Sequence, residues 1–170
     1  MTGFRKALLV GFALLALKHL FDPDFWSPFA GLVFGTHEFG HLAFAFFGEW
    51  LAVAGGSLMQ LLLPAAMMVY FHRVRGDRLG VAVCGVWLAI SLANLAVYIG
   101  DARAQQLDLV SFSPGGAIHD WNYLLGSLGL LSRDGALAGL VRLVGLITLA
   151  ASVVGAARAP RGSKTVRKRS

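Results

Sequence analysis

Three residues in one short segment have the types and the spacing of a zinc hydrolase site. His37, Glu38 and His41 form the pattern His-Glu-x-x-His. On a helix, residues four apart lie on the same face one turn apart, so the two imidazoles can bind one Zn²⁺. The glutamate next to the first histidine then reaches the metal-bound water and can act as its general base. The sequence therefore predicts a Zn²⁺ cofactor held by His37 and His41, with Glu38 as the catalytic residue.

A catalytic zinc needs a third protein ligand beside an open water position. We expect this ligand to be Asp120, because two histidines and a carboxylate are a common hydrolytic set. Asp120 lies in the segment GGAIHDWNYLL, at an expected loop-to-helix junction, where it could instead be the N-cap or a first-turn acid of the helix. His119 is nearly as good a candidate, and either residue could stabilise the transition state if the other binds the metal. Asp101 is a further alternative ligand, or else a solvated helix end.

Polar residues and glycines inside the apolar segments are candidates for supporting roles. Gln60 and Asn94 either hydrogen-bond between helices or bind the substrate backbone and stabilise an oxyanion beside the zinc. The pair Gly55 and Gly56 would let a substrate strand approach the backbone closely. His19, at the end of an apolar block, is expected at the membrane interface, away from the metal.

The composition places these residues in a membrane protein. The chain has 170 residues, of which 56% are hydrophobic and only 14% are charged, and the mean hydropathy is +0.67. Soluble domains contain about 25% charged residues, so the composition argues against a soluble globular domain. The single cysteine, Cys84, excludes an intrachain disulfide framework and multi-cysteine zinc modules.

The apolar residues form blocks of the length that a membrane span requires, about 20 residues. The five long blocks cover residues 7–21, 26–48, 52–72, 79–100 and 136–157. The shorter segment 121–131 cannot cross alone and fits a re-entrant or partial helix. We expect an all-α polytopic membrane bundle of about five spans plus this short helix, in one domain over residues 1–157. The His-Glu-x-x-His motif would then lie about 16 Å from the interfacial Trp26, near the middle of the bilayer.

Basic residues at the C-terminus account for the whole net charge of +6. The tail 158–170 contains six of them and no acid, which is typical of the cytoplasmic side of a membrane span. We expect this tail to be disordered and cytoplasmic. The expected partners are the lipid bilayer and a membrane-associated protein substrate, and no nucleic acid, because the core offers no basic stripe. The side of the N-terminus stays open. With five crossings, the basic turn at Arg73 and Arg75 shares a side with the tail, and Arg5 and Lys6 lie on the other side. With six crossings, the tail shares a side with the N-terminus, and the basic turn lies opposite.

The motif HEFGH within an apolar segment resembles that of the site-2-protease-like family of intramembrane zinc metallopeptidases. The resemblance implies that His37 and His41 bind zinc, that Glu38 is the base, and that the Gly-rich AVAGGSLMQ contains non-helical backbone near the active site. The family's usual third ligand, an aspartate in a Leu-Asp-Gly motif, has no counterpart here. The one Leu-Asp pair lies at Asp108, and no soluble substrate-selecting domain is present.

These features together predict an intramembrane zinc metallopeptidase. Two other classes fit the same residues: a membrane protein that transports or senses metal, and a non-catalytic scaffold with a protease-like shape. Glu38 favours the peptidase, because a transport site does not need a general base between its two histidines.

Overall fold

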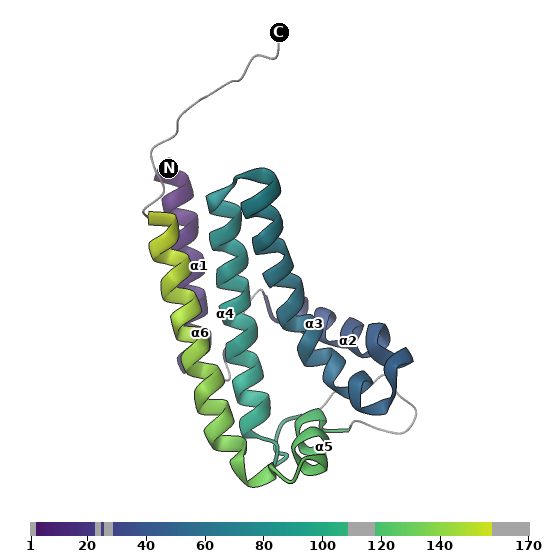
Figure 1. Cartoon of the computed structure of the whole chain (residues 1–170). Coiled ribbons are helices and arrows are strands. Elements are labelled where there is room, and N and C mark those ends of the chain that lie inside the picture. Colours follow the sequence, from purple (N-terminus) through teal and green to yellow (C-terminus); the bar gives the residue numbers. More distant parts are fainter. Residues whose placement is uncertain (1–2, 23–24, 26–28, 109–117, 158–170) are drawn as a thin grey trace.

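The computed structural model describes residues 3–22, 25, 29–108 and 118–157, which contain helices and no strands (Figure 1). The long helices are α1 (Gly3–Phe21), α3 (Glu49–Tyr70), α4 (Arg78–Gly100) and α6 (Asp134–Ala157). The shorter helices are α2 (Ala30–Phe44) and α5 (Asp120–Ser127). Single 3₁₀ turns occupy Ala45–Phe47 and Leu131–Arg133, and a π-helical turn occupies Phe71–Arg75. The predicted all-α bundle is confirmed.

Helix α4 lies at the centre of this bundle and contacts α1, α3 and α6. Its sequence is apolar around the whole circumference, as expected of a helix that is buried on several sides. Val86, Ala89 and Ile90 are fully buried and form the core with residues of α1 and α6. Helix α4 therefore provides the fixed wall against which the other elements pack.

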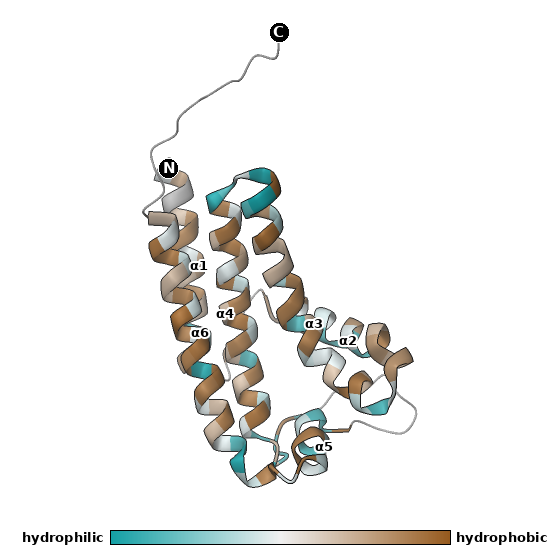
Figure 2. Cartoon of the chain, viewed as in Figure 1, coloured by the Kyte–Doolittle hydropathy of each residue, from teal (hydrophilic) through white to brown (hydrophobic). Residues whose placement is uncertain are grey.

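Three helical stretches are long and apolar enough to cross a membrane: Glu49–Arg75, Arg78–Gly100 and Leu131–Ala157. Figure 2 shows apolar residues along most of their length, with polar residues concentrated at the ends. The described residues thus give three candidate spans rather than the predicted five or so. The apolar part of α1, Ala7–His19, is shorter than these stretches.

The apolar block expected over 26–48 is not one span. Helix α2 has 15 residues, so it is about 22 Å long, which is less than the roughly 30 Å of the hydrocarbon core. A 3₁₀ turn ends it, and Gly48 then reverses the chain with φ of 96°, a conformation that favours glycine. Helix α3 begins at the next residue, Glu49. The interfacial position predicted for Trp26 lies outside the described residues.

The reversal packs α2 against the first half of α3, where two glycines bring the backbones together (Figure 1). A Cβ atom on Gly55 would lie 2.6 Å from the carbonyl oxygen of Gly40. A Cβ atom on Gly40 would collide with the carbonyl oxygen of Gly55. Because the obstacle in both cases includes backbone, neither glycine can gain a side chain without separating the helices.

We therefore expect Gly40→Ala to destabilise the bundle by about 1–3 kcal/mol, the usual cost of overpacking a close contact. Gly35→Ala, on the same helix, is the matched control, since nothing lies within 4 Å of its Cβ position. Its better helix propensity should stabilise the protein by up to about 1 kcal/mol. Unfolding in mixed detergent micelles, followed by circular dichroism, measures both changes. Equal stability of the two variants would contradict the close contact between α2 and α3.

Candidate metal centre

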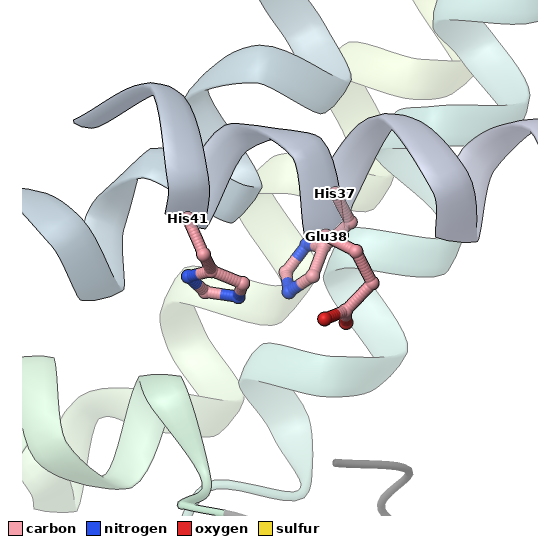
Figure 3. Close-up of side chains that lie close together, drawn as sticks. All are labelled: His37, Glu38 and His41. Atoms are coloured by element: carbon pink, nitrogen blue, oxygen red, sulfur yellow. The ribbon is translucent and has the colours of Figure 1, made fainter. Parts of the chain in front are cut away.

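Helix α2 presents the three motif residues toward α4 and α5 (Figure 3). Potential ligand atoms of His37, Glu38 and His41 all lie within 4.8 Å of one another, close enough to hold a metal ion. The two imidazole rings meet edge to face, with their centroids 4.7 Å apart. The i, i+4 spacing thus produces the arrangement that the sequence predicts.

The carboxylate of Asp120 completes this group from the first turn of α5. Its Oδ2 atom lies 3.0 Å from His37 Nε2 and 3.3 Å from His41 Nε2. Two ligand atoms bound tetrahedrally to one zinc, each at about 2.0–2.1 Å, are about 3.3–3.4 Å apart, so the observed spacing is close to that of a zinc site. Burial raises the pKa of the Asp120 carboxyl, but its hydrogen bonds to the imidazoles outweigh burial and hold that pKa below its usual range. The carboxylate is therefore ionised, as a metal ligand must be.

The other ring nitrogens of the two histidines are fixed by acceptors on α3. His41 Nδ1 lies 2.9 Å from the carbonyl oxygen of Ala52, which can only accept. His37 Nδ1 lies 3.1 Å from Gln60 Oε1. The amide group of Gln60 is oriented by its own N–H donation to the carbonyl oxygen of Ser91, at 2.8 Å. These two acceptors suit the histidines as metal ligands, because an imidazole that donates from Nδ1 can present its Nε2 lone pair to a metal once the Nε2 proton is released.

Gly56 keeps the space beside both Nε2 atoms open. A Cβ atom at this position would lie 2.6 Å from His41 Nε2 and 2.7 Å from His37 Nε2. The residues present thus fit a bound metal ion, because two imidazoles, one carboxylate and a cradle without a side chain meet at one point. The two glycines differ in role from the prediction: Gly55 packs against Gly40, and Gly56 faces the histidines. The segment AVAGGSLMQ is entirely helical within α3, unlike the non-helical backbone that the resemblance implied.

Helix α5 is held against α3 and α4 by side-chain hydrogen bonds. The indole of Trp121 donates to Ser57 Oγ at 3.1 Å, and that of Trp50 donates to Ser127 Oγ at 3.0 Å. The backbone N–H of Asp120 donates to the hydroxyl oxygen of Tyr98 at 3.0 Å. These bonds fix the start of α5, and with it the carboxylate that faces the two histidines.

Asp120 is an acid in the first turn of α5, one of its two predicted positions, and His119 is the N-cap residue. The Nδ1 atom of His119 accepts the backbone N–H of Asn122 at 3.3 Å. Its Nε2 atom lies 3.3 Å from Asp101 Oδ2. Asp101 also accepts the backbone N–H groups of Gln106 and Leu107. Burial raises the pKa of Asp101, but these hydrogen bonds bring it below its ordinary value.

His119 and Asp101 therefore pair with each other, and neither contacts the two motif histidines. Both ring nitrogens of His119 and both oxygens of Asp101 are already engaged. Of the three alternatives for the third ligand, the structure brings only Asp120 to the histidine pair. The pair of His119 and Asp101 instead stabilises the end of α4 and the start of α5.

A cavity of about 340 Å³ opens beside His37 and Glu38. Asn94, from α4, lines it and accepts a hydrogen bond on Oδ1 from Gln60 Nε2 at 3.3 Å. Gln60 itself is 1% exposed and lies behind His37, away from the cavity lining. The two predicted supporting residues thus have different positions: Gln60 is the hydrogen-bond partner of His37, and Asn94 lines the cavity. His19, expected to lie away from the metal, is buried and lines the same cavity.

Tyr98 is the site residue that sequence reasoning missed. Its ring stacks on His119 with centroids 4.4 Å apart, and it meets His37 edge to face at 5.9 Å. It also lines the cavity. A tyrosine near the end of an apolar block suits a membrane interface, so its sequence position carries no signal of a role at the metal centre.

Gln60→Leu should lower the affinity for zinc about 10- to 100-fold, the usual effect of removing the partner of a ligating histidine. Gln60→Glu keeps an acceptor for the Nδ1 proton of His37 and should retain more of the affinity. Competition with a chromophoric chelator measures both constants, and circular dichroism verifies the fold. Equal affinities of Gln60→Leu and the wild type would show that this contact does not orient the histidine.

The geometry of this centre comes from α2, α3, α4 and α5 together. Its ligand atoms, the tautomers of its histidines and the adjacent cavity define the chemistry available to it. Comparison with known proteins assigns no family: no protein-family model matches the chain, and no curated protein or solved structure matches it.

Proposed function

We propose that this chain is an intramembrane zinc metallopeptidase that hydrolyses peptide bonds of membrane-associated protein substrates. The observation that carries the proposal is the meeting of three potential ligand atoms at one point. His37 Nε2 and His41 Nε2 both face Asp120 Oδ2, at 3.0 and 3.3 Å. A divalent metal would bind all three atoms at once and replace the protons between them.

Glu38 is the group that moves protons in this proposal. A bound zinc lowers the pKa of a coordinated water to about 7. Glu38 lies next to the first ligand and lines the cavity where a substrate would lie, so its carboxylate would face that water. Its carboxylate accepts the proton of the attacking water and then transfers it to the leaving amine.

Asn94 and Tyr98 are the cavity residues suited to bind the substrate. The Oδ1 atom of Asn94 accepts from Gln60, which leaves its NH₂ group to donate to a substrate carbonyl. A donor directed at the developing oxyanion stabilises the transition state more than the ground state. Tyr98 holds the backbone of Asp120 and so positions the third ligand from the same wall of the cavity.

The ends of the helices support a membrane orientation. The start of α1, the turn between α3 and α4, and the end of α6 lie at one end of the bundle (Figure 1). Exposed Arg73 and Arg75 are in that turn, and the basic residues 158–170, outside the described part of the chain, follow α6. By the positive-inside rule this end is cytoplasmic. If α1 is a fourth crossing and α2 does not cross, the N-terminus, the basic turn and the tail share a side, which would remove the conflict found in the sequence.

The test is elemental analysis of the full chain purified in detergent and supplied with zinc. We expect about one zinc per chain in the wild type and a loss of that zinc in Asp120→Ala. Asp101→Ala is the matched control and should keep the zinc, because, among the described residues, the side chain of Asp101 hydrogen-bonds with His119 and nearby backbone. A wild type without metal would overturn the proposal and favour a scaffold. Zinc that moves across vesicles without any hydrolysis would instead indicate metal transport.

A further inference from the structure

The cavity beside Glu38 has an apolar wall that the hydrolytic chemistry does not use. Ala30, Val33 and Phe34 of α2 line it on one side. Val97 of α4 and Leu107 after α4 line it as well. The polar lining residues are His19, His37, Glu38, Asn94, Tyr98 and Asp108. Because His37 and Glu38 belong to the candidate metal centre, the cavity and the reacting atoms are continuous.

We infer that this cavity binds a bulky aliphatic or aromatic side chain of the substrate, on the residue that supplies the leaving amine. This inference depends on the proposed peptidase function. The carboxylate that protonates the leaving nitrogen must lie next to it. Because Glu38 lines the cavity, the residue attached to that nitrogen places its side chain against Val33, Phe34 and Val97.

The size of the cavity agrees with such an occupant. An engineered apolar protein cavity of about 150 Å³ holds a benzene molecule. The cavity here, at about 340 Å³, is more than twice as large and admits a leucine or phenylalanine side chain together with part of its backbone. An alanine side chain would leave most of the apolar wall without contact. Val33 and Val97 would therefore make the site prefer a large apolar residue on the leaving-amine side of the substrate.

Zinc-binding hydroxamates test this preference without requiring a known substrate. The probes are HONH–CO–CH₂–CH(R)–CO–NHCH₃ with R as methyl, isobutyl or benzyl, and their dissociation constants are measured on the zinc-loaded full chain in detergent. The isobutyl compound carries three more carbons than the methyl compound, and each buried carbon contributes up to about fourfold in affinity. We expect the isobutyl and benzyl compounds to bind about 10- to 50-fold more tightly than the methyl compound.

Val97→Trp fills the cavity and should reduce the preference between the three compounds to less than about twofold. Circular dichroism and the zinc content of this variant verify that it still folds and holds zinc. Val144→Trp, on an exposed part of α6, is the matched control and should keep the full preference. Leu107→Ala, which removes part of the wall from a loop rather than a helix, should weaken binding of the benzyl compound several-fold.

The outcomes separate this inference from the proposed function. Equal affinity of the wild type for all three compounds would overturn the side-chain pocket and leave the zinc site standing. An unchanged preference in Val97→Trp would place the pocket elsewhere and also overturn the inference. No binding of any hydroxamate would instead contradict the zinc centre itself.

Discussion

Gly56→Ala should abolish zinc binding while the helical bundle stays folded. The added Cβ atom would meet His41 Nε2 at 2.6 Å, His37 Nε2 at 2.7 Å and His41 Cε1 at 2.7 Å. These atoms are the far ends of side chains that can rotate, so the imidazoles move and the helices do not. Displaced imidazoles no longer direct their lone pairs to one point. We expect the zinc content to fall from about one per chain to nearly zero.

Elemental analysis with circular dichroism measures this result in one preparation. Gly31→Ala is the control, because its Cβ position has no neighbour within 4 Å, and it should keep its zinc. The comparison with Gly40→Ala is also informative, since there the obstacle is backbone and stability falls instead. Full zinc content in Gly56→Ala would contradict a metal ion bound between α3 and the two histidines.

Glu38→Gln should retain zinc and lose hydrolysis about 10²- to 10⁴-fold, the usual contribution of a general base. Glutamine has nearly the same shape, so the ligands His37, His41 and Asp120 stay in place. It has no basic oxygen that can take a proton from the attacking water. Hydrolysis of a quenched fluorogenic peptide of apolar sequence in detergent, with zinc content measured in parallel, gives both quantities.

The matched control is Glu49→Gln, because Glu49 is the other glutamate of the chain. It is exposed at the start of α3, after the turn that ends α2. Glu49→Gln should leave hydrolysis unchanged. A Glu38→Gln protein as active as the wild type would exclude this residue as the base, even if the zinc site were intact.

The sequence predicts the long helices well where charged residues flank an apolar block. The blocks over 79–100 and 136–157 correspond to α4 and α6 within two residues, because Arg78, Asp101 and Asp134 bound them. The block over 26–48 is not one span because α2 is too short. A 3₁₀ turn ends α2 after Phe44, and the positive φ of Gly48 then reverses the chain. A hydropathy pattern reveals neither event.

In the candidate site, too, local sequence predicts some positions, and others depend on contacts between distant parts of the chain. The spacing of His37 and His41 requires only a helix, so local sequence predicts their shared face. The position of Asp120 depends on Tyr98 and on the contact of Trp121 with Ser57, which come from helices distant in the chain. The chemistry of metal ligands leaves Asp120, His119 and Asp101 as candidates for the third ligand. Only the packing of α5 against α3 and α4 shows which of them lies next to the two histidines.

Because the ligands lie far apart in the sequence, a bound metal would also affect the stability of the fold. His37 and Asp120 are 83 residues apart. A bound ion would therefore act as a cross-link that closes a long loop of the unfolded chain. Such a cross-link lowers the conformational entropy of the unfolded chain by an amount that increases with the logarithm of the loop length. It therefore stabilises the native state even without new packing contacts. The same ion would join the first turn of α5 to the middle of α2, in addition to the hydrogen bonds that hold α5 against α3 and α4.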